Sequence, residues 1–250
     1  MHMHALSETT ALVTGSSRGF GRAIAIALAE AGANVVGVAR DQARLEELRK
    51  QIGDGFTAIV ADASDPTTAG QLIDRYRPRT LVLNAGANPL ARPLQHQTCQ
   101  TFSRNWDVDV QHVFHWTREA LLRPLDPSSV VITFSSGAAL NGSPLSGGYA
   151  GAKATIRFIA SYAAAEAERA AIGIRFISVL PTLTPATDLG ASGVAAYARR
   201  QGVTTGTFLE GRGPALTPER VGAAIVELAV DPAHASGGYQ ITNAGLSPVR

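Results

Sequence analysis

Three polar side chains of this sequence have a spacing that suits proton transfer. Tyr149 and Lys153 are four residues apart, so a helix would place both on one face, and Ser136 comes thirteen residues before the tyrosine. A phenol with an ordinary pKa of about 10 is a weak base at neutral pH, but a neighbouring ammonium stabilises its charged form. The serine hydroxyl could hold a carbonyl or alcohol oxygen. Together the three side chains could move a proton at an oxygen whose charge changes during a reaction.

A glycine-rich turn near the start of the chain predicts a binding site for a dinucleotide. Found in isolation, three glycines such as Gly15, Gly19 and Gly21 more often mark a tight turn that has only a packing role and binds no ligand. Here the turn follows the apolar run 11–13 and opens a helix over 21–31. That context suits a pyrophosphate, because glycines admit the backbone close to the anion and the helix amides face it. The expected contacts in the turn are Gly15, Ser17, Arg18, Gly19, Phe20 and Gly21.

Apolar runs typical of buried strands alternate with helical periodicities along the whole chain. Parallel strands need helical crossovers of this kind. We therefore predict an α/β fold, a three-layer, Rossmann-like, doubly wound parallel sheet of about seven strands in a single domain. The expected strands are 11–13, 34–39, 56–61, 80–83, 130–134, 174–180 and 238–242, and the expected helices are 21–31, 41–51, 67–77, 102–122, 149–171 and 219–230.

The length of 250 residues and the hydrophobic content of 45% fit one domain. We expect a flexible tail at 1–7, the domain over 8–250, and a mobile insertion at about 182–217, where no period is strong. The formal charge of +2 is small and its basic residues are scattered, which favours neither nucleic acid nor a membrane surface as a partner. Cys99 is the only cysteine, and there is no signal core or membrane-length apolar run, so we expect a cytoplasmic protein.

Taken together, these motifs resemble the short-chain dehydrogenase/reductase family over about residues 8–245. The resemblance implies an oxidoreductase that interconverts a secondary alcohol and a ketone with a nicotinamide dinucleotide. It implies that Tyr149 transfers the proton, that Ser136 holds the substrate oxygen, and that Lys153 also binds the nicotinamide ribose. Ser135 competes with Ser136, but the spacing favours the second serine. The motifs in family order are the glycine turn, Asn84-Ala85-Gly86, Ser136, Tyr149 and Lys153.

The end of the second expected strand predicts the choice of cofactor. A carboxylate there would bind the ribose hydroxyls of NAD, whereas the 2′-phosphate of NADP needs positive charge. Arg40 stands at that end and Arg18 could reach the same phosphate, so NADP(H) is favoured over a plain solvated role for Arg40. Asp41 follows directly and keeps NAD(H) possible. By the resemblance, Asp62 would lie by the adenine ring, although a capping role before Pro66 fits almost as well.

The remaining expected cofactor contacts lie at the ends of later strands. Small residues there would let the cofactor lie against the backbone, and in the family the asparagine mainly ties strands together. Thr182 follows the proline where the family usually has glycine. The expected contacts are Asn84, Ala85, Gly86, Pro181 and Thr184, with Thr187 as the alternative to Thr184.

Asp109 departs from the family pattern, which usually has an asparagine forty residues before the tyrosine. By the resemblance, that asparagine holds a water that connects the lysine to solvent. An aspartate could accept hydrogen bonds in its place, while its negative charge would oppose formation of the phenolate. Asp109 also raises a rival function, a cofactor-binding protein of this fold with little or no turnover. The intact Ser136, Tyr149 and Lys153 argue against the rival, because a pure sensor needs no proton relay.

The helices 102–122 and 149–171 are apolar on more than one stripe, which predicts burial on more than one side. By the resemblance, they pair with their symmetry mates into a homodimer, often doubled to a homotetramer by the last helix and strand. His112 and His115 lie on the first of these helices without a third ligand, so we expect interface packing and no metal site. The pair Arg199 and Arg200 is expected on a solvated surface, with an anionic carrier as the alternative. The sequence selects no substrate beyond a small alcohol or ketone.

Overall fold

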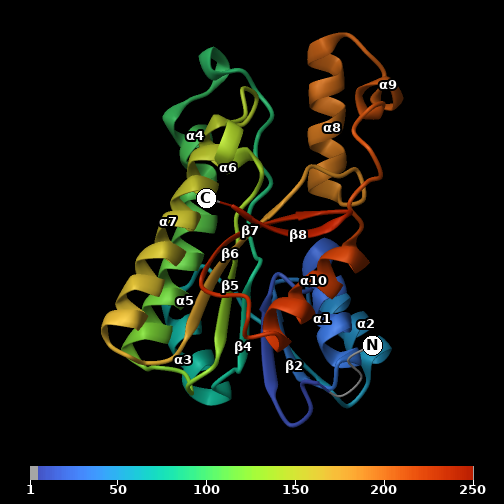
Figure 1. Ribbon diagram of the computed structural model, residues 1–250. Coiled ribbons are helices and arrows are strands. Elements are labelled where there is room, and N and C mark those ends of the chain that lie inside the picture. The colour runs from blue at the N-terminus through green and yellow to red at the C-terminus, as the bar shows by residue number, and fades with distance from the viewer. Residues whose placement is uncertain (1–4, 250) are drawn as a thin grey trace.

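The chain folds into three layers, with one sheet between two sets of helices, as the computed structural model of residues 5–249 shows (Figure 1). No helix among these residues is long and apolar enough to cross a membrane. The strands are β1 (Thr10–Thr14), β2 (Asn34–Ala39), β3 (Phe56–Val60), β4 (Thr80–Leu83), β5 (Val130–Phe134), β6 (Arg175–Pro181), β7 (Gly237–Thr242) and β8 (Gly245–Val249). The α-helices are α1 (Gly19–Glu30), α2 (Gln42–Ile52), α3 (Pro66–Tyr76), α4 (Cys99–Asn105), α5 (Gln111–Leu122), α6 (Ala138–Asn141), α7 (Gly147–Arg169), α8 (Asp188–Gln201), α9 (Thr205–Leu209) and α10 (Pro218–Val230).

The order of the strands creates a crevice at one edge of the sheet. That order is β3-β2-β1-β4-β5-β6-β7-β8, so the chain starts at β1, winds outward to β3 and returns to β4 on the other side of β1. Thr14 and Leu83, the last residues of β1 and β4, stand side by side in the parallel register. Open α/β sheets bind their ligands beyond the carboxyl ends of the strands at such a reversal. The glycine turn and Asn84 therefore leave the sheet at the same place.

Two hydrophobic cores hold the layers together, one on each face of the sheet. Side chains of a strand alternate between the faces, so in β1 Val13 enters the core under α1 and α10 while Leu12 enters the core under α3, α5 and α7. Ile24 of α1, Ile225 of α10 and Trp116 of α5 are fully buried. Burial of one large apolar side chain contributes about 1.5–3 kcal/mol. The sheet is thus a well-packed base for the residues at its carboxyl edge.

The predicted α/β doubly wound sheet is confirmed, with eight strands in place of about seven. The additional strand, β8, runs antiparallel to β7 and forms the edge of the sheet. Its sequence contains Pro248, which argues against a strand interior because proline cannot donate a ladder hydrogen bond. An edge strand tolerates the proline, and Leu246 packs against the core beneath α10.

The predicted helix 102–122 is interrupted, which corrects the sequence-based expectation. A π-helical turn, Trp106–Val110, joins α4 to α5. Single π-turns inside helices are rare and frequently occur at functional sites. The wider turn carries Asp109, a charged residue that is only 1% exposed and accepts hydrogen bonds from inside the molecule. A carboxylate that must reach these buried donors explains why the regular helix gives way here.

Two other segments differ from the expectation. The insertion at 182–217 contains α8 and α9, with a small core of its own formed by Val194, Ala198 and Phe208. The sequence does contain signals for the starts of both helices, since Thr187 caps α8 and Thr204 caps α9. Residues 1–4 of the predicted tail lie outside the described residues. The packed domain begins before residue 8, since Leu6 is buried and bonded through its amide to α1's C-terminal end at Ala31.

Candidate active site

The glycine turn after β1 is shaped by close backbone approach. Gly15 has a φ of +69°, a left-handed value that other residues rarely adopt. A Cβ added at Gly21 would lie 2.2 Å from the Gly15 carbonyl oxygen. These two glycines let α1 begin directly against the turn, with the amides at its start facing the crevice. Ser17, Arg18, Gly19 and Phe20, which the sequence analysis expects to contact a cofactor, line the same crevice.

Thr14 joins the ends of β1 and β4 beneath the crevice. Its hydroxyl accepts hydrogen bonds from the amides of Asn84 at 3.0 Å and Ala85 at 3.2 Å. The Asn84 side chain in turn donates to the carbonyl oxygens of Thr14 and Gly15. This mutual bonding fixes the distance between the glycine turn and the backbone of Asn84, Ala85 and Gly86. The asparagine is therefore placed to tie the strands rather than to contact a ligand through its amide.

Lys153 enters the crevice from α7 with two of its three N–H bonds already used. Its Nζ donates to the carbonyl oxygen of Phe134 at 2.9 Å and pairs with Oδ2 of Asp109 at 3.2 Å. The Tyr149 ring centroid lies 5.5 Å from the same Nζ, so the helical spacing does bring the two side chains together. Burial by itself lowers the pKa of Lys153, but Asp109 and Tyr149 outweigh it and hold that pKa above its usual value.

Asp109 is the acceptor on which three donors converge. Its Oδ1 accepts from the Ala87 amide at 2.7 Å, and its Oδ2 accepts from the Asn105 side-chain amide at 3.3 Å and from Lys153. An asparagine could present an oxygen to only part of this set and would turn its NH₂ toward the other donors. The carboxylate thus fits this position better than the residue that the family usually has there.

The two adjacent serines at the end of β5 have different environments. Ser135 is buried, and its hydroxyl donates to the backbone carbonyl of Lys153 at 2.7 Å. The Ser136 hydroxyl oxygen accepts a hydrogen bond from the Ala138 amide at 3.2 Å, which leaves its own proton for another acceptor. Both serines line the crevice, but only Ser136 retains an unused O–H.

One cleft of about 1390 Å³ lies beyond the carboxyl ends of the strands, and its lining includes Gly15, Asn84, Asp109, Ser135, Ser136, Tyr149 and Lys153. Its far wall is formed by α8 and the segment that leads into it, including Pro181 and Thr184. The Thr184 hydroxyl donates to the Leu216 carbonyl oxygen at 2.6 Å, and the Thr187 hydroxyl caps α8. The Thr184 hydroxyl oxygen also accepts from the Ala186 amide at 3.2 Å, which leaves it one acceptor site, whereas Thr187 keeps its own proton.

The other end of the cleft is lined by arginines. Arg40 is 78% exposed, and its closest carboxylate oxygen is that of Asp62 at 3.9 Å. Arg44, in the first turn of α2, lines the same end and was not among the residues predicted from the sequence. Asp41 caps α2 through the Arg44 amide at 3.1 Å, so its carboxylate serves the helix start. Arg18 pairs with Asp188 of α8 at 3.1 Å.

The sequence offered Asp62 an alternative role as the cap of the next helix, but another residue fills that role. Asp65 caps α3 by accepting from the amides of Thr67 and Thr68. Asp62 itself lines the cleft, where the amide and hydroxyl of Ser64 hold the pKa of its carboxyl below the usual value.

Comparison with known proteins identifies the family. A family model described as short chain dehydrogenase matches residues 9–197. The chain belongs to the short-chain dehydrogenase/reductase family. It is 34% identical over 167 residues to the short-chain type dehydrogenase/reductase y4eK of Sinorhizobium fredii, a match that covers 64% of each chain. It is 33% identical over 105 residues to the D-erythrulose reductase of Gallus gallus, over 42% of each chain. The solved structure titled levodione reductase is similar in fold, with a TM-score of 0.85 and 21% identity over 96% of this chain and 98% of that one.

His112 corrects the prediction that both histidines of this short-chain dehydrogenase/reductase lie in an interface. Its ring is fully buried, with Nε2 3.0 Å from the Thr14 hydroxyl, and Nδ1 has no hydrogen-bond partner among the described residues. Burial, together with the positive charge of Lys153, lowers the pKa of His112 to about 3. His115 lies instead on the outer side, edge-on to the exposed Phe114 ring. Asp109 and Trp116 are seven residues apart and both are buried. His112 lies between them on the same inward face of the helix.

We predict that His112 makes the fold acid-sensitive. The unfolded chain binds a proton at this histidine below its ordinary pKa of 6.5, whereas the folded protein stays neutral there down to about 3. The contribution of His112 to the free energy of unfolding is therefore fully present above pH 6.5 and falls as the pH drops toward 3. Between pH 7 and pH 5 this loss is about 2 kcal/mol.

Urea denaturation of the native protein and of His112→Gln at both pH values measures this loss. His112→Gln should lose about 2 kcal/mol less than the native protein, and His96→Gln, at an exposed position, should lose as much as the native protein does. Equal losses in native protein and His112→Gln would contradict the prediction.

Proposed function

We propose that this protein interconverts a ketone and a secondary alcohol, with NADP(H) as the preferred cofactor. The observation that carries the proposal is the meeting of Ser136, Tyr149 and Lys153 in one cleft with the glycine turn. D-erythrulose reductase, one of the relatives, is named for a reaction of this class. The volume of about 1390 Å³ leaves room for a dinucleotide and a small substrate, and the lining runs from the glycine turn to α8.

The residues present fit a dinucleotide. Gly15 and Gly21 leave room for a pyrophosphate against the start of α1, where a Cβ would fill the turn. The third N–H of Lys153 is free to donate to ribose hydroxyls, since its other two are bonded within the protein. The Thr184 hydroxyl oxygen and the backbone after Pro181 would hold the carboxamide end. When bound, the cofactor supplies or accepts the hydride.

The protein's own side chains would handle the proton. In the direction of reduction, Ser136 donates its unused O–H to the substrate carbonyl oxygen and so orients the carbonyl. Tyr149 gives its phenolic proton to the same oxygen as negative charge develops there. The ammonium of Lys153 stabilises the phenolate that remains. Asp109 keeps the lysine in position, and its charge balances that ammonium inside the protein.

We predict that Tyr149→Phe abolishes most turnover. The ring is kept and only the proton donor is lost, so kcat should fall by about 10²- to 10⁴-fold, the usual contribution of general acid catalysis. The assay is NADPH oxidation with a panel of ketones, and calorimetry of NADPH binding checks that the variant still takes up cofactor. Tyr76→Phe, which changes a tyrosine of α3 outside the cleft, serves as the matched control.

Two results of this experiment would speak against the proposal. Unchanged turnover in Tyr149→Phe would remove the tyrosine from the mechanism. A native protein that binds NADPH tightly yet reduces none of the ketones would favour the rival function, a cofactor-binding protein without turnover.

The preference for NADP(H) rests on the arginines at the adenosine end of the cleft. Arg40 is mostly exposed and Arg44 lines the same end of the cleft, while the Asp41 carboxylate caps α2 and pairs with Arg44 Nε at 3.4 Å. A 2′-phosphate would thus meet guanidinium groups, while the ribose hydroxyls of NAD would find Asp41 already used.

We predict that Arg40→Ala weakens NADPH binding by about 1.5–3 kcal/mol, or roughly 10- to 150-fold in Kd, because a charge-assisted hydrogen bond is lost. Binding of NADH should change little. Isothermal titration calorimetry with both cofactors measures the effect, and Arg75→Ala on α3 is the control. The assignment fails if the native protein binds NADH as tightly as NADPH.

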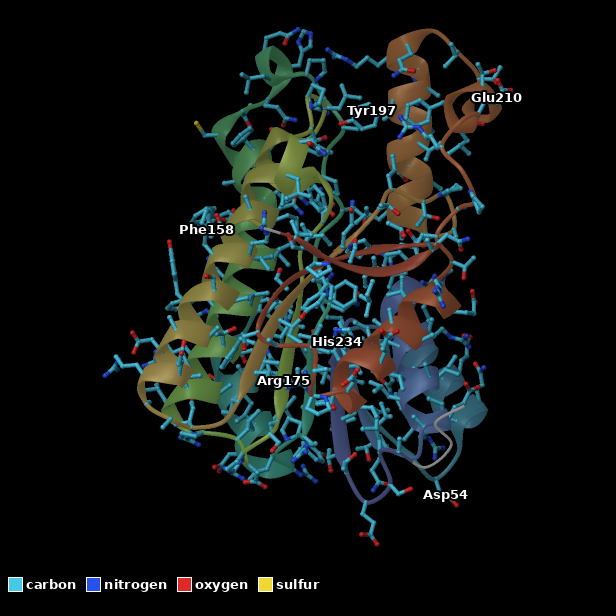
Figure 2. The ribbon with its side chains drawn as sticks, viewed as in Figure 1. Asp54, Phe158, Arg175, Tyr197, Glu210 and His234 are labelled. Atoms are coloured by element: carbon cyan, nitrogen blue, oxygen red, sulfur yellow. The ribbon has the colours of Figure 1, made fainter. Side chains whose placement is uncertain are left out.

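We also propose that the outer faces of α5 and α7 form a dimer interface. Large aromatic side chains are exposed there, and Figure 2 places Phe158 on the outer side of α7. Side chains of this kind in one patch usually mark a binding surface. For a tetramer, the second interface would have to use β8, which covers β7 at the edge of the sheet. The exposed aromatic side chains of these helices and the adjoining π-turn are Trp106, Phe114, Phe158 and Tyr162.

We predict a dimer or tetramer mass for the native protein in light scattering at micromolar concentration. Phe158→Glu should shift the mass toward the monomer, because it would place a charge within an apolar interface. Val60→Glu changes another exposed apolar residue, at the end of β3, and should leave the mass unchanged. A native monomer would refute the interface.

A further inference from the structure

Three hydroxyl groups meet on the substrate side of the cleft. Ser143, in the loop after α6, contacts the hydroxyl of Ser146 at 2.6 Å and also the phenolic oxygen of Tyr197, which reaches over from α8. All three residues line the cleft together with Ser136 and Tyr149. We call Ser143, Ser146 and Tyr197 the hydroxyl cluster. Its Ser146 directly precedes α7 and is three residues from Tyr149, so the cluster adjoins the proposed proton donor.

The hydrogen-bonding capacity of the hydroxyl cluster is mostly unused. Each hydroxyl has one donor and two acceptor sites, which gives three donors and six acceptors in total. The two contacts within the cluster use two donors and two acceptors. One donor and four acceptors remain, because neither Ser146 nor Tyr197 makes another side-chain hydrogen bond among the described residues. A ligand that donates hydrogen bonds therefore suits this surface better than an anion, which can only accept them.

The position of Tyr197 is fixed by the unit that carries it. Its ring stacks on Phe208 of α9, with centroids 6.1 Å apart and planes inclined by 10°. Val194 and Ala198, on the same helix, are buried against Phe208. Figure 2 shows Tyr197 on the side of α8 that faces α4 and α6, so the phenol spans the cleft toward Ser143. The phenol is thus presented to the cleft by a packed helix pair rather than by a loose loop.

We propose that the substrate carries at least one hydroxyl group besides its carbonyl and that the hydroxyl cluster binds it, with Tyr197 as a residue that determines specificity. This inference rests on the proposed function. A substrate hydroxyl can donate to one of the four acceptors and accept from the remaining donor, so it satisfies both kinds of group. A plain ketone would leave these polar groups desolvated and unpaired, which costs binding free energy.

Arg212 lines the cleft near Tyr197 and Phe208, and its charge would favour a different substrate. Its guanidinium lies 4.2 Å from the Phe208 ring centroid, and its Nε donates to the Phe208 carbonyl oxygen at 3.0 Å. A carboxylate on the substrate could use the remaining N–H groups. The guanidinium is held against α9 by these contacts, whereas the hydroxyl cluster adjoins Tyr149. A keto acid is therefore included in the test as the competing outcome.

The test compares three four-carbon carbonyl compounds with NADPH: the trihydroxylated ketone erythrulose, butan-2-one and 2-oxobutanoate. For the native protein, kcat/KM should be at least about tenfold higher for erythrulose than for butan-2-one, because at least one hydrogen-bonded hydroxyl distinguishes them. In Tyr197→Phe this ratio should fall at least about fivefold, mainly through KM for erythrulose. Ser143→Ala should lower the ratio as well, and the control Tyr76→Phe should preserve it.

Several outcomes would overturn the inference. These are a native ratio near one, a preference for 2-oxobutanoate, or a loss in Tyr197→Phe that is equal for both ketones, which would mean that the phenol only closes the cleft.

Calorimetry of erythritol binding to the NADP⁺-loaded protein separates this inference from the proposed function. If no ketone is reduced but erythritol binds to the native protein and not to Tyr197→Phe, the hydroxyl cluster stands and the reductase proposal falls. If erythritol does not bind and erythrulose is not preferred, the hydroxyl cluster is not a substrate site.

Discussion

The buried ion pair between Lys153 and Asp109 is the interaction on which the site depends. Both side chains are almost completely enclosed, at 7% and 1% exposure, and a buried charge without a partner costs several kcal/mol. The pair therefore stays together, with Phe134, Ala87 and Asn105 supplying the remaining hydrogen bonds. Through it a positive charge that is itself almost completely enclosed is held 5.5 Å from the centroid of the Tyr149 ring. Low local dielectric makes that charge more effective than it would be in water.

Much of the nearby backbone follows from this pair. The π-helical turn brings Asp109 inward, and Gly86 leaves room for it, because a Cβ there would lie 3.0 Å from its carboxylate. One turn further on, His112 is buried against Thr14, which in turn holds the ends of β1 and β4 together. The crevice for a cofactor and the proton relay thus share one polar layer. That layer lies at the carboxyl edge of the sheet and connects β1, β4, the end of β5 and α7 by hydrogen bonds.

The sequence was sufficient for the parallel strand order of the sheet and for the family, and it singled out many residues that line the cleft but not Arg44 or the hydroxyl cluster. Tyr149 and Lys153 were recognisable because a helical step fixes their relation locally, and the glycine turn because strand and helix flank it. Other features depend on contacts between distant segments, which local patterns do not encode. Asp109 could be singled out only as a departure, since its donors come from Ala87, Asn105 and Lys153.

The misses have similar physical reasons. The strand β8 contains a proline that only an edge position tolerates, and α8 and α9 pack mainly on each other, so their apolar stripe is short. His112 was assigned with His115 to an interface because the helix resembles one that the family buries between subunits, and its actual partner, Thr14, is 98 residues away in the sequence. The Ser143 and Tyr197 hydroxyls are 54 residues apart in the sequence, and no periodicity relates them.

The pH dependence of kcat/KM for ketone reduction by native protein and by Asp109→Asn tests the central claim most directly. If Asp109 balances Lys153, its removal leaves the ammonium free to favour the phenolate, and the loss of activity at high pH should begin at a lower pH in the variant. Such a shift does not depend on how much of the variant is folded. Asp107→Asn, at an exposed neighbouring position, should reproduce the native profile. Superimposable profiles for native protein and Asp109→Asn would contradict the account.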